Sequence, residues 1–374
     1  MPPMTHRERI LSVYRGETPD VVPFMLDLSH WFYHKHGMPW DLSRVYEQPE
    51  VELIEYHKKM GVGFYLPNLA SFIDVKYGED VCATVTKSQD GLEITWQFDT
   101  PLGCISRTRR WNEQTYAWGI REWGIATERD LNVLAYALGS RVYTPRWNRY
   151  RAWVECVGDA GVVYAVFAYS GMGHLLNSWM GIENTVYAAA DRPEGLCEVI
   201  DRINANNLEC MDLLAHSPAE VVLVGDNFSS DIQSPDFFDT WSKPYYAELI
   251  RRLHAGGKHV AVHIDGRLTG LLDVFGRLGA DCADAVTPST GGGLTPEQCR
   301  QEAGTKLILS SGVPPNLWLP DVPLDDFKRA VMQWLDLKKY GPRLIANAGD
   351  QVPPNADEDR IQIMRDMVEG HGRY

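Results

Sequence analysis

The sequence predicts an α/β protein built as a single (β/α)8 TIM barrel, and three observations support this fold. Eight β-like runs occur along the 374 residues, and most are followed by a helical stretch. Most of these runs are almost continuously apolar, as expected of parallel strands that helices cover. Strand and helix alternate most regularly in the second half of the chain, which is typical of a barrel. We therefore expect residues 1–374 to form one domain.

The expected strands lie, in order, at residues 21–28, 62–69, 162–169, 220–226, 259–265, 282–287, 306–311 and 344–348. The sequence also marks three helix starts, one before the first expected strand and two between later strands. Thr5 and Glu8 have the spacing of a capping box. Ser234-Pro235 and Thr295-Pro296 each combine an N-cap residue with proline at the first helical position. We expect the last helix to run from about residue 355 to about residue 370.

Between the second and third expected strands the alternation breaks. The runs 81–87 and 92–98 flank Asp90-Gly91, a hairpin signal, and a further strand-like run follows at 104–111. We therefore expect residues 74–125 to form an antiparallel β insertion on the rim of the barrel. The insertion carries four tryptophans that would line a pocket or a protein interface, or form its own small core: Trp96, Trp111, Trp118 and Trp123.

The composition excludes several classes of partner. A net charge of −14 argues against nucleic acid and against an anionic membrane surface. No apolar run approaches the roughly 20 residues that span a bilayer, and the polar N-terminus shows no secretory signal. The seven cysteines are dispersed without a Cys-x-x-Cys pair, which is typical of reduced thiols. We expect a cytoplasmic protein and leave open whether it forms a homo-oligomer.

Polar side chains recur where the expected strands end, and active sites of barrels lie at the carboxyl ends of their strands. In chain order, these residues are Asp27, His30, Asn68, Tyr169, Asp226, Asn227, His263, Asp265, Thr287, Ser310, Ser311, Asn347 and Asp350.

The fifth expected strand carries the most informative pair. With a period of two, Val260, Val262 and Ile264 face one way, while His263 and Asp265 face the other. With Asp226 or Asp350 as a third ligand, the pair would suit a zinc ion. Without metal, His263 would act as a general acid or base oriented by a carboxylate. A buried histidine that an aspartate satisfies is the structural alternative.

Three parts of the chain carry a family resemblance. They are Arg7-Glu8-Arg9 to Val22-Pro23, Asp226 to Ser234-Pro235, and a set in the second half comprising His263-x-Asp265-Gly266, Thr287-Pro288 and Val352-Pro353-Pro354. Together they resemble the uroporphyrinogen decarboxylase-like superfamily, which contains the porphyrin decarboxylase and many corrinoid-dependent methyltransferases. The resemblance covers the chain apart from the insertion, and it implies a (β/α)8 barrel.

Two departures from that superfamily argue against two of its activities, thiol methylation and porphyrin decarboxylation. Its thiol methyltransferases hold zinc with a His-x-Cys pair and a later cysteine, whereas here Asp265 stands in the first cysteine position and residues 347–350 contain no cysteine. The porphyrin decarboxylase holds carboxylates with arginines after the first strand, whereas residues 29–36 here contain none. This aromatic segment fits an aromatic or quaternary-ammonium group better.

The leading hypothesis is therefore a methyltransferase that moves a methyl group from a small O- or N-methylated substrate, with an aromatic methyl ether as one candidate, to cob(I)alamin on a partner corrinoid carrier protein. The cobalamin supplies the nucleophile, and zinc is a candidate metal held by His263, Asp265 and Asp350. The expected catalytic residues are His263, Asp265 and Asp226. The expected substrate-binding residues are Asp27, His30, Tyr169, Asn227, Asn347 and Asp350.

Three alternatives stay open. One is methyl transfer in the other direction, from a methylcorrinoid to a folate or a thiol. Another is a porphyrin decarboxylase-like enzyme. The third is a barrel that binds a ligand without catalysis.

Overall fold

The structure is a computed structural model that describes residues 3–37, 48–66, 72–167, 169–288 and 293–374. Its centre is a six-stranded parallel sheet in the order β12-β11-β10-β9-β8-β7. The strands are β7 (Ala165–Phe167), β8 (Val221–Phe228), β9 (His259–Ile264), β10 (Cys282–Val286), β11 (Ile308–Val313) and β12 (Leu344–Ala348). The third to eighth expected strands are thus confirmed, and the fold is α/β.

The first two expected strands are not regular strands, and the six-stranded sheet is not closed. In the described residues of 21–28 and 62–69 only isolated bridges form, among them Phe24 with Ala346, Met25 with Gly63, and Phe64 with Gly161. Pro23 lacks an N–H group and so cannot donate to a sheet ladder, which helps to explain why the first segment pairs at single residues. Expected strand-end residue Asn68 lies outside the described residues.

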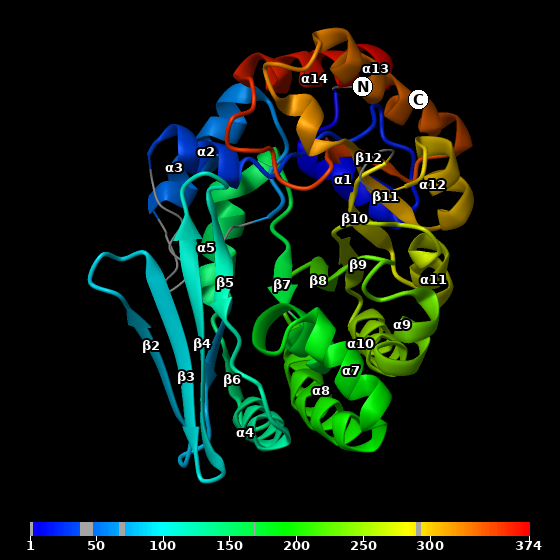
Figure 1. Ribbon diagram of the computed structural model, residues 1–374. Helices are drawn as coiled ribbons and strands as arrows, with labels where there is room; N and C mark the ends of the chain where they lie inside the picture. Colours follow the sequence, from blue (N-terminus) through cyan, green and yellow to red (C-terminus); the bar gives the residue numbers. More distant parts are fainter. Residues whose placement is uncertain (1–2, 38–47, 67–71, 168, 289–292) are drawn as a thin grey trace.

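Helices alternate with the parallel strands and lie around them (Figure 1). The N-terminal helices are α1 (His6–Arg15), α2 (Ser29–Lys35) and α3 (Gln48–Met60). Those in the middle of the chain are α4 (Glu128–Leu138), α5 (Trp147–Val157), α6 (Gly171–His174), α7 (Ile182–Asp191), α8 (Pro193–Ala215), α9 (Pro235–Trp241) and α10 (Lys243–Ala255). The last are α11 (Leu271–Leu278), α12 (Pro296–Ala303), α13 (Leu324–Leu335) and α14 (Glu358–His371).

The expected helix starts form as the sequence indicates. Thr5 and Thr295 make capping boxes, and the Ser234 side chain accepts a hydrogen bond from the backbone of Phe237. The last helix begins at Glu358, a little later than expected, because Asp357 caps it. None of the helices in the described part of the chain combines the length and the apolar character needed to cross a bilayer.

A four-stranded antiparallel sheet stands beside the parallel one (Figure 1), in the order β2-β3-β4-β5. It consists of β2 (Cys82–Lys87), β3 (Glu93–Thr100), β4 (Gly103–Asn112) and β5 (Ala117–Glu122), so the expected hairpin is confirmed. In a separate two-stranded sheet, β1 (Ile73–Lys76) pairs antiparallel with β6 (Val142–Pro145). The chain between these two strands also includes α4, which packs on β3 and β4.

The four tryptophans of this region have different surroundings. Trp111 is buried, with its ring centroid 4.8 Å from that of Tyr116. Trp118 and Trp96 are partly buried against hydrophobic cores, while Trp123 is 42% exposed. Three of the four therefore serve the packing of this part of the molecule.

Alternate positions of the parallel strands contribute to two separate cores. In β9, Val260, Val262 and Ile264 belong to the large core that includes the covering helices, whereas Ala261 belongs to a smaller core with Tyr164 and other residues of the interior. The predicted alternation of this strand is confirmed. It assigns His263 to the same face as Ala261.

Two glycines allow the bridged segments to approach one another. A Cβ atom at Gly63 would overlap the carbonyl oxygen of Phe24, and one at Gly161 would overlap that of Phe64. The missing side chains therefore permit backbone contact at these two bridges.

Gly161→Ala is expected to lower the free energy of unfolding by about 1–3 kcal/mol, because the added methyl group forces the backbones of residues 161 and 64 apart. Urea unfolding monitored by circular dichroism measures this change. Gly195→Ala on α8, where a Cβ atom meets nothing within 4 Å, is the control and should not destabilise the protein. Equal stability of the two variants would contradict the role given to Gly161.

Candidate active site

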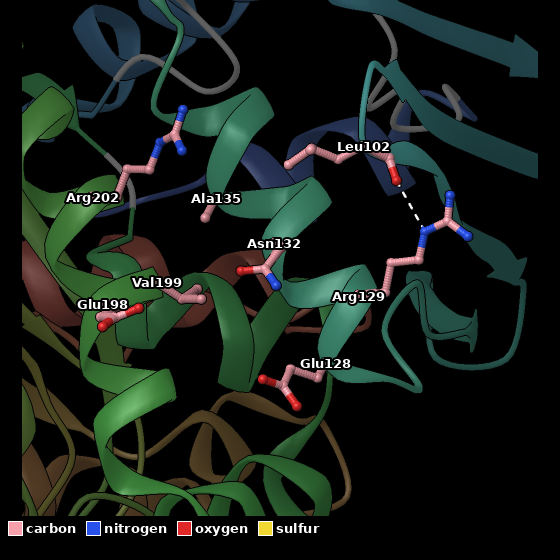
Figure 2. A pocket seen from close by; sticks show the side chains of 8 residues that line it. All are labelled: Leu102, Glu128, Arg129, Asn132, Ala135, Glu198, Val199 and Arg202. Carbon is pink, nitrogen blue, oxygen red and sulfur yellow. Dashed lines mark hydrogen bonds between the residues drawn. The ribbon is translucent and has the colours of Figure 1, made fainter.

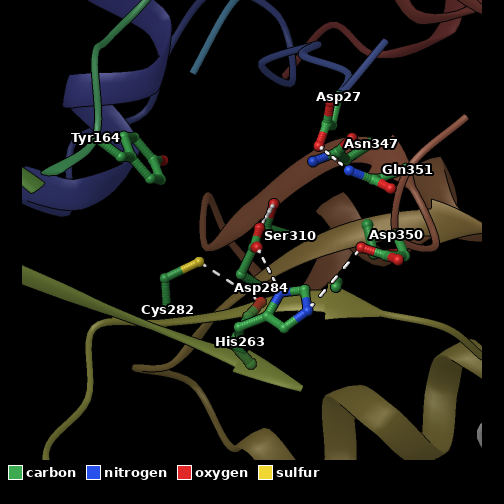
Figure 3. A network of polar contacts seen from close by, with 12 residues as sticks. Asp27, Tyr164, His263, Cys282, Asp284, Ser310, Asn347, Asp350 and Gln351 are labelled. Atoms are coloured by element: carbon green, nitrogen blue, oxygen red, sulfur yellow. Dashed lines mark hydrogen bonds and ion pairs between the residues drawn. The ribbon is translucent and has the colours of Figure 1, made fainter. Parts of the chain in front are cut away.

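The interior face of four neighbouring strands carries one polar side chain each, at nearly the same height. His263, Asp284, Ser310 and Asn347 follow, by two residues, the interior-core residues Ala261, Cys282, Ile308 and Ile345. The strand register pairs His263 with Asp284 directly. Because side chains two residues apart lie on one face of a strand, the four polar groups gather above the same apolar interior (Figure 3).

His263 and Asp284 form the central contact of this cluster. The Nδ1 atom of His263 lies 3.3 Å from Oδ2 of Asp284, and the Ser310 hydroxyl donates to Oδ1 of the same carboxylate, also at 3.3 Å. The Asp284 side chain is only 2% exposed, whereas that of His263 is 22% exposed. With Nδ1–H directed at Asp284, the Nε2 atom of His263 faces the other way, toward Asp350 at 4.0 Å.

These contacts make His263 a stable cation. Burial by itself lowers the pKa of an imidazolium, but the hydrogen bond to Asp284 and the charges of Asp350, Asp284 and Asp265 outweigh it and raise the pKa of His263 to about 9. His263 therefore carries a proton on each ring nitrogen near neutral pH.

Asp350 forms the accessible side of the cluster. Its side chain is surrounded by protein on most sides yet remains 42% exposed, so it meets solvent. Burial raises the pKa of Asp350 to about 6, with His263 acting in the opposite direction and Asp265, Asp27 and Asp284 reinforcing it. Its carboxylate is thus much easier to protonate than that of a free aspartate.

Asp27 is held at this end of the sheet by two hydrogen bonds, one from the residues that follow it and one from the segment after β12. Its carboxylate accepts from the backbone N–H of Ser29 at 2.9 Å and from the side-chain amide of Gln351 at 3.1 Å (Figure 3). Asn347, close by, uses its side-chain oxygen to accept from the backbone of Ala348. The structure therefore brings together five of the expected residues: Asp27, His263, Asp265, Asn347 and Asp350.

Asp226 is not part of this cluster. It follows Val222 and Val224, which belong to the helix-facing core, and it is 1% exposed. Its carboxylate accepts from the backbone and the hydroxyl of Ser170, at 2.7 and 2.6 Å. The interior position beside it is Gly225, where a Cβ atom would contact the backbone of His263. Asp226 thus joins the start of α6 to β8 on the helix side of the sheet, because strand periodicity turns it away from His263.

The remaining expected residues lie at the edge of the cluster or beyond it. Asn227 has a φ of 53°, a left-handed conformation at the end of β8. His30 directs Nε2 at the carbonyl oxygen of Tyr116 at 2.6 Å, and so joins α2 to the antiparallel sheet. Burial raises the pKa of Tyr169, whose ring contacts that of His174.

Sequence reasoning missed Asp284. The strand segment Cys282-Ala283-Asp284-Ala285-Val286 is otherwise apolar, so a lone carboxylate inside it was the available signal. A buried carboxylate requires a partner, and the neighbouring strand offers His263. The residue that follows, Ala285, has a φ of 61°, an unusual conformation for alanine.

The described residues offer no group of three histidine, cysteine, aspartate or glutamate side chains that could hold a metal ion. Zinc held by His263, Asp265 and Asp350 therefore stays a prediction. The contact between His263 and Asp284 is also compatible with the metal-free alternative, in which a carboxylate orients the imidazole.

A separate groove of about 730 Å³ lies between α4 and α8 (Figure 2). Its walls include Glu128, Asn132, Glu198 and Arg202, and Arg129 donates to the carbonyl oxygen of Leu102 at its edge. It contains none of the residues around His263.

A family model described as uroporphyrinogen decarboxylase (URO-D) matches residues 168–371, more than half of the chain. The chain belongs to the uroporphyrinogen decarboxylase family. The matched range contains β8 to β12, with His263 on β9, Asp284 on β10 and Asp350 just after β12. The family resemblance noted from the sequence is confirmed.

One solved structure supports the same fold. A methyltransferase from Methanosarcina mazei aligns over 98% of this chain and 99% of its own, with a TM-score of 0.64 and 14% identity. A putative vitamin-B12 independent methionine synthase from Listeria monocytogenes aligns over 94% of this chain and 96% of its own, with a TM-score of 0.43 and 11% identity. The search of curated proteins gives no match.

Asp284→Asn is expected to lower the pKa of His263 from about 9, because the variant removes the charged acceptor at Nδ1. NMR titration of the imidazole measures this pKa. The control is Asp281→Asn, which removes the acid that pairs with His254 and lies near His259 on the same sheet, and it should leave His263 unchanged. A wild-type pKa near 6.5 would contradict the charged state of His263.

Proposed function

We propose that this protein is a methyltransferase that transfers a methyl group from a small O- or N-methylated substrate to cob(I)alamin carried by a partner corrinoid protein. One observation carries the proposal: His263 is charged, is fixed through Nδ1 by Asp284, and directs Nε2 toward the accessible carboxylate of Asp350. Membership of the uroporphyrinogen decarboxylase family supports it, since the superfamily includes corrinoid-dependent methyltransferases.

The chemical problem in such a transfer is the leaving group. When a methyl group departs from an ether, the C–O bond breaks and the oxygen keeps both bonding electrons, so it must gain a proton or leave as a poor anion. The cob(I)alamin substrate supplies the electron pair for the new bond to the methyl group. The protein has to supply the proton at the oxygen.

His263 is suited to supply that proton. Asp284 fixes the ring orientation through Nδ1, which leaves the Nε2 proton for the substrate. Asp350 lies on the Nε2 side, and its pKa of about 6 suits a group that returns a proton to His263 after each turnover. Asp27 and Asn347 line the same end of the sheet and are proposed to position the substrate.

We also propose that the two bridged segments complete an eight-membered barrel. The isolated parallel bridges run from β12 to Phe24, from Met25 to Gly63, and from Phe64 to Gly161 just before β7. In such a ring of eight, the segment that carries Asp27 would stand across the opening from β9, so Asp27 would share a rim with His263 and face it.

His263→Gln is expected to lower the rate of methyl transfer by roughly 10²–10⁴-fold, the usual contribution of a general acid. Formation of methylcobalamin from cob(I)alamin, free or on a corrinoid carrier, measures the rate with a panel of methoxyaromatic compounds and methylamines. His254→Gln, which changes a histidine paired with Asp281 away from the cluster, is the control. A wild-type protein that demethylates no panel member would refute the proposed activity.

The pH dependence follows from the charged state of His263. The acid form exists below its pKa of about 9, so kcat/KM should fall as the pH rises through about 9. Asp284→Asn lowers that pKa and should move the decline to lower pH. A rate that stays level from pH 7 to pH 10 would show that His263 is not the proton donor.

A further inference from the structure

Strand β4 carries two arginines that lack a carboxylate partner. Nε and Nη1 of Arg107 and Nε of Arg109 are buried and have no hydrogen-bond partner among the described residues. Arg110, the next residue on the strand, is exposed and pairs with Glu93 at 2.7 Å. In a chain with a net charge of −14, carboxylates are plentiful, yet within the described structure none lies close enough to either of these half-buried guanidinium groups to form an ion pair.

Contacts across the molecule fix where these arginines lie. The guanidinium carbon of Arg107 is 4.6 Å from the ring centroid of Trp96 and 5.1 Å from that of Trp179. Nη2 of Arg109 approaches the carbonyl oxygen of Asn177 at 3.5 Å. The Asn177 side chain in turn donates to the backbone oxygen of Asp226 at 2.7 Å. The arginines of the antiparallel sheet therefore reach the carboxyl end of β8, the strand next to the one that carries His263.

Tyr169 connects this place to the proposed active site. Burial raises the pKa of Tyr169, Arg109 and Arg107 act to lower it, and Asp226 and Asp265 act to raise it. Its phenol group therefore lies within electrostatic range of both arginines and of Asp265, two residues after His263 on the chain. His174, whose ring contacts that of Tyr169, is partly buried near Arg107, and its Nδ1 atom is buried without a hydrogen-bond partner among the described residues.

The physical cost of this arrangement points to a ligand. Two half-buried like charges repel each other, and burial together with Arg109 lowers the pKa of Arg107 to about 10. The faces of Trp96 and Trp179 attract the Arg107 cation but do not neutralise it or satisfy its N–H groups. An oxyanion between the arginines would do both, because guanidinium N–H groups match the geometry of a carboxylate.

We propose that Arg107 and Arg109 bind a carboxylate group of the substrate, so that the opposite, methylated end of that substrate faces His263. The occupant is identified as the substrate on the strength of the proposed function. The two ends of the site would then differ in charge. Two cations from β4 lie at one end, and the carboxylates of Asp265, Asp284 and Asp350 surround His263 at the other.

Binding of carboxylates tests this proposal without any methyl transfer. Isothermal titration and thermal shift are measured with acetate, benzoate and 4-methoxybenzoate, against chloride at equal ionic strength and against the neutral methyl ester of 4-methoxybenzoate. At least one of the carboxylates is expected to bind and to stabilise the wild-type protein beyond chloride. Arg107→Gln and Arg109→Gln are each expected to weaken that binding roughly tenfold or more.

Control variants separate this proposal from the proposed function. Arg110→Gln removes an exposed arginine from the same strand and should bind the carboxylates like the wild type. His263→Gln should also keep carboxylate binding even though it loses methyl transfer. Should Arg107→Gln fail to fold, Arg109→Gln and Arg107→Lys, which keeps the charge but loses the planar fork, carry the test.

The proposal is overturned if none of the three carboxylates binds the wild type better than chloride, or if both glutamine variants bind as the wild type does. Inorganic phosphate that binds while the carboxylates do not would overturn the assignment of the carboxylate. An inactive methyl-transfer assay together with arginine-dependent carboxylate binding would refute the proposed function and leave the carboxylate site in place.

Discussion

A positive charge on His263 can persist inside this protein only because carboxylates surround it. Burial disfavours an imidazolium, and Asp284 reverses that preference by accepting a hydrogen bond from within a strand that is otherwise apolar. The pair also depends on strand register, since β9 and β10 place the two residues directly opposite each other. A shift of one residue in either strand would turn one partner toward the helices and leave a buried charge alone.

The second constraint is the placement of opposite charges on different parts of the fold. The acids around His263 come from the parallel sheet and the segment after β12, while Arg107 and Arg109 come from the antiparallel sheet. Because these elements are far apart in the sequence, only the packing of β4 against residues 175–179 brings the arginines near β8. Such a polarity would orient a bipolar substrate before any chemistry takes place.

Much of this arrangement could be predicted from the sequence, and the failures have identifiable causes. The alternation of Val260, Val262 and Ile264 correctly assigned His263 to the interior face, because strand periodicity is a local property. The same periodicity should have removed Asp226 from the site, since Val222 and Val224 share its face. Asp284 could not be predicted because its role depends on pairing with another strand, and Arg107 and Arg109 could not because their position depends on how β4 packs against residues 175–179.

The last six parallel strands, the capped helix starts, the hairpin at Asp90-Gly91 and the family could all be predicted from the sequence, because each depends on local spacing or on direct similarity. Three features depend on the packing of distant segments: Asp284 faces His263, Asp226 faces the helices, and guanidinium nitrogens of Arg107 and Arg109 are buried without a carboxylate partner. The reason is that charge, burial and pKa depend on which distant groups become neighbours, and a linear pattern carries little information about such pairings.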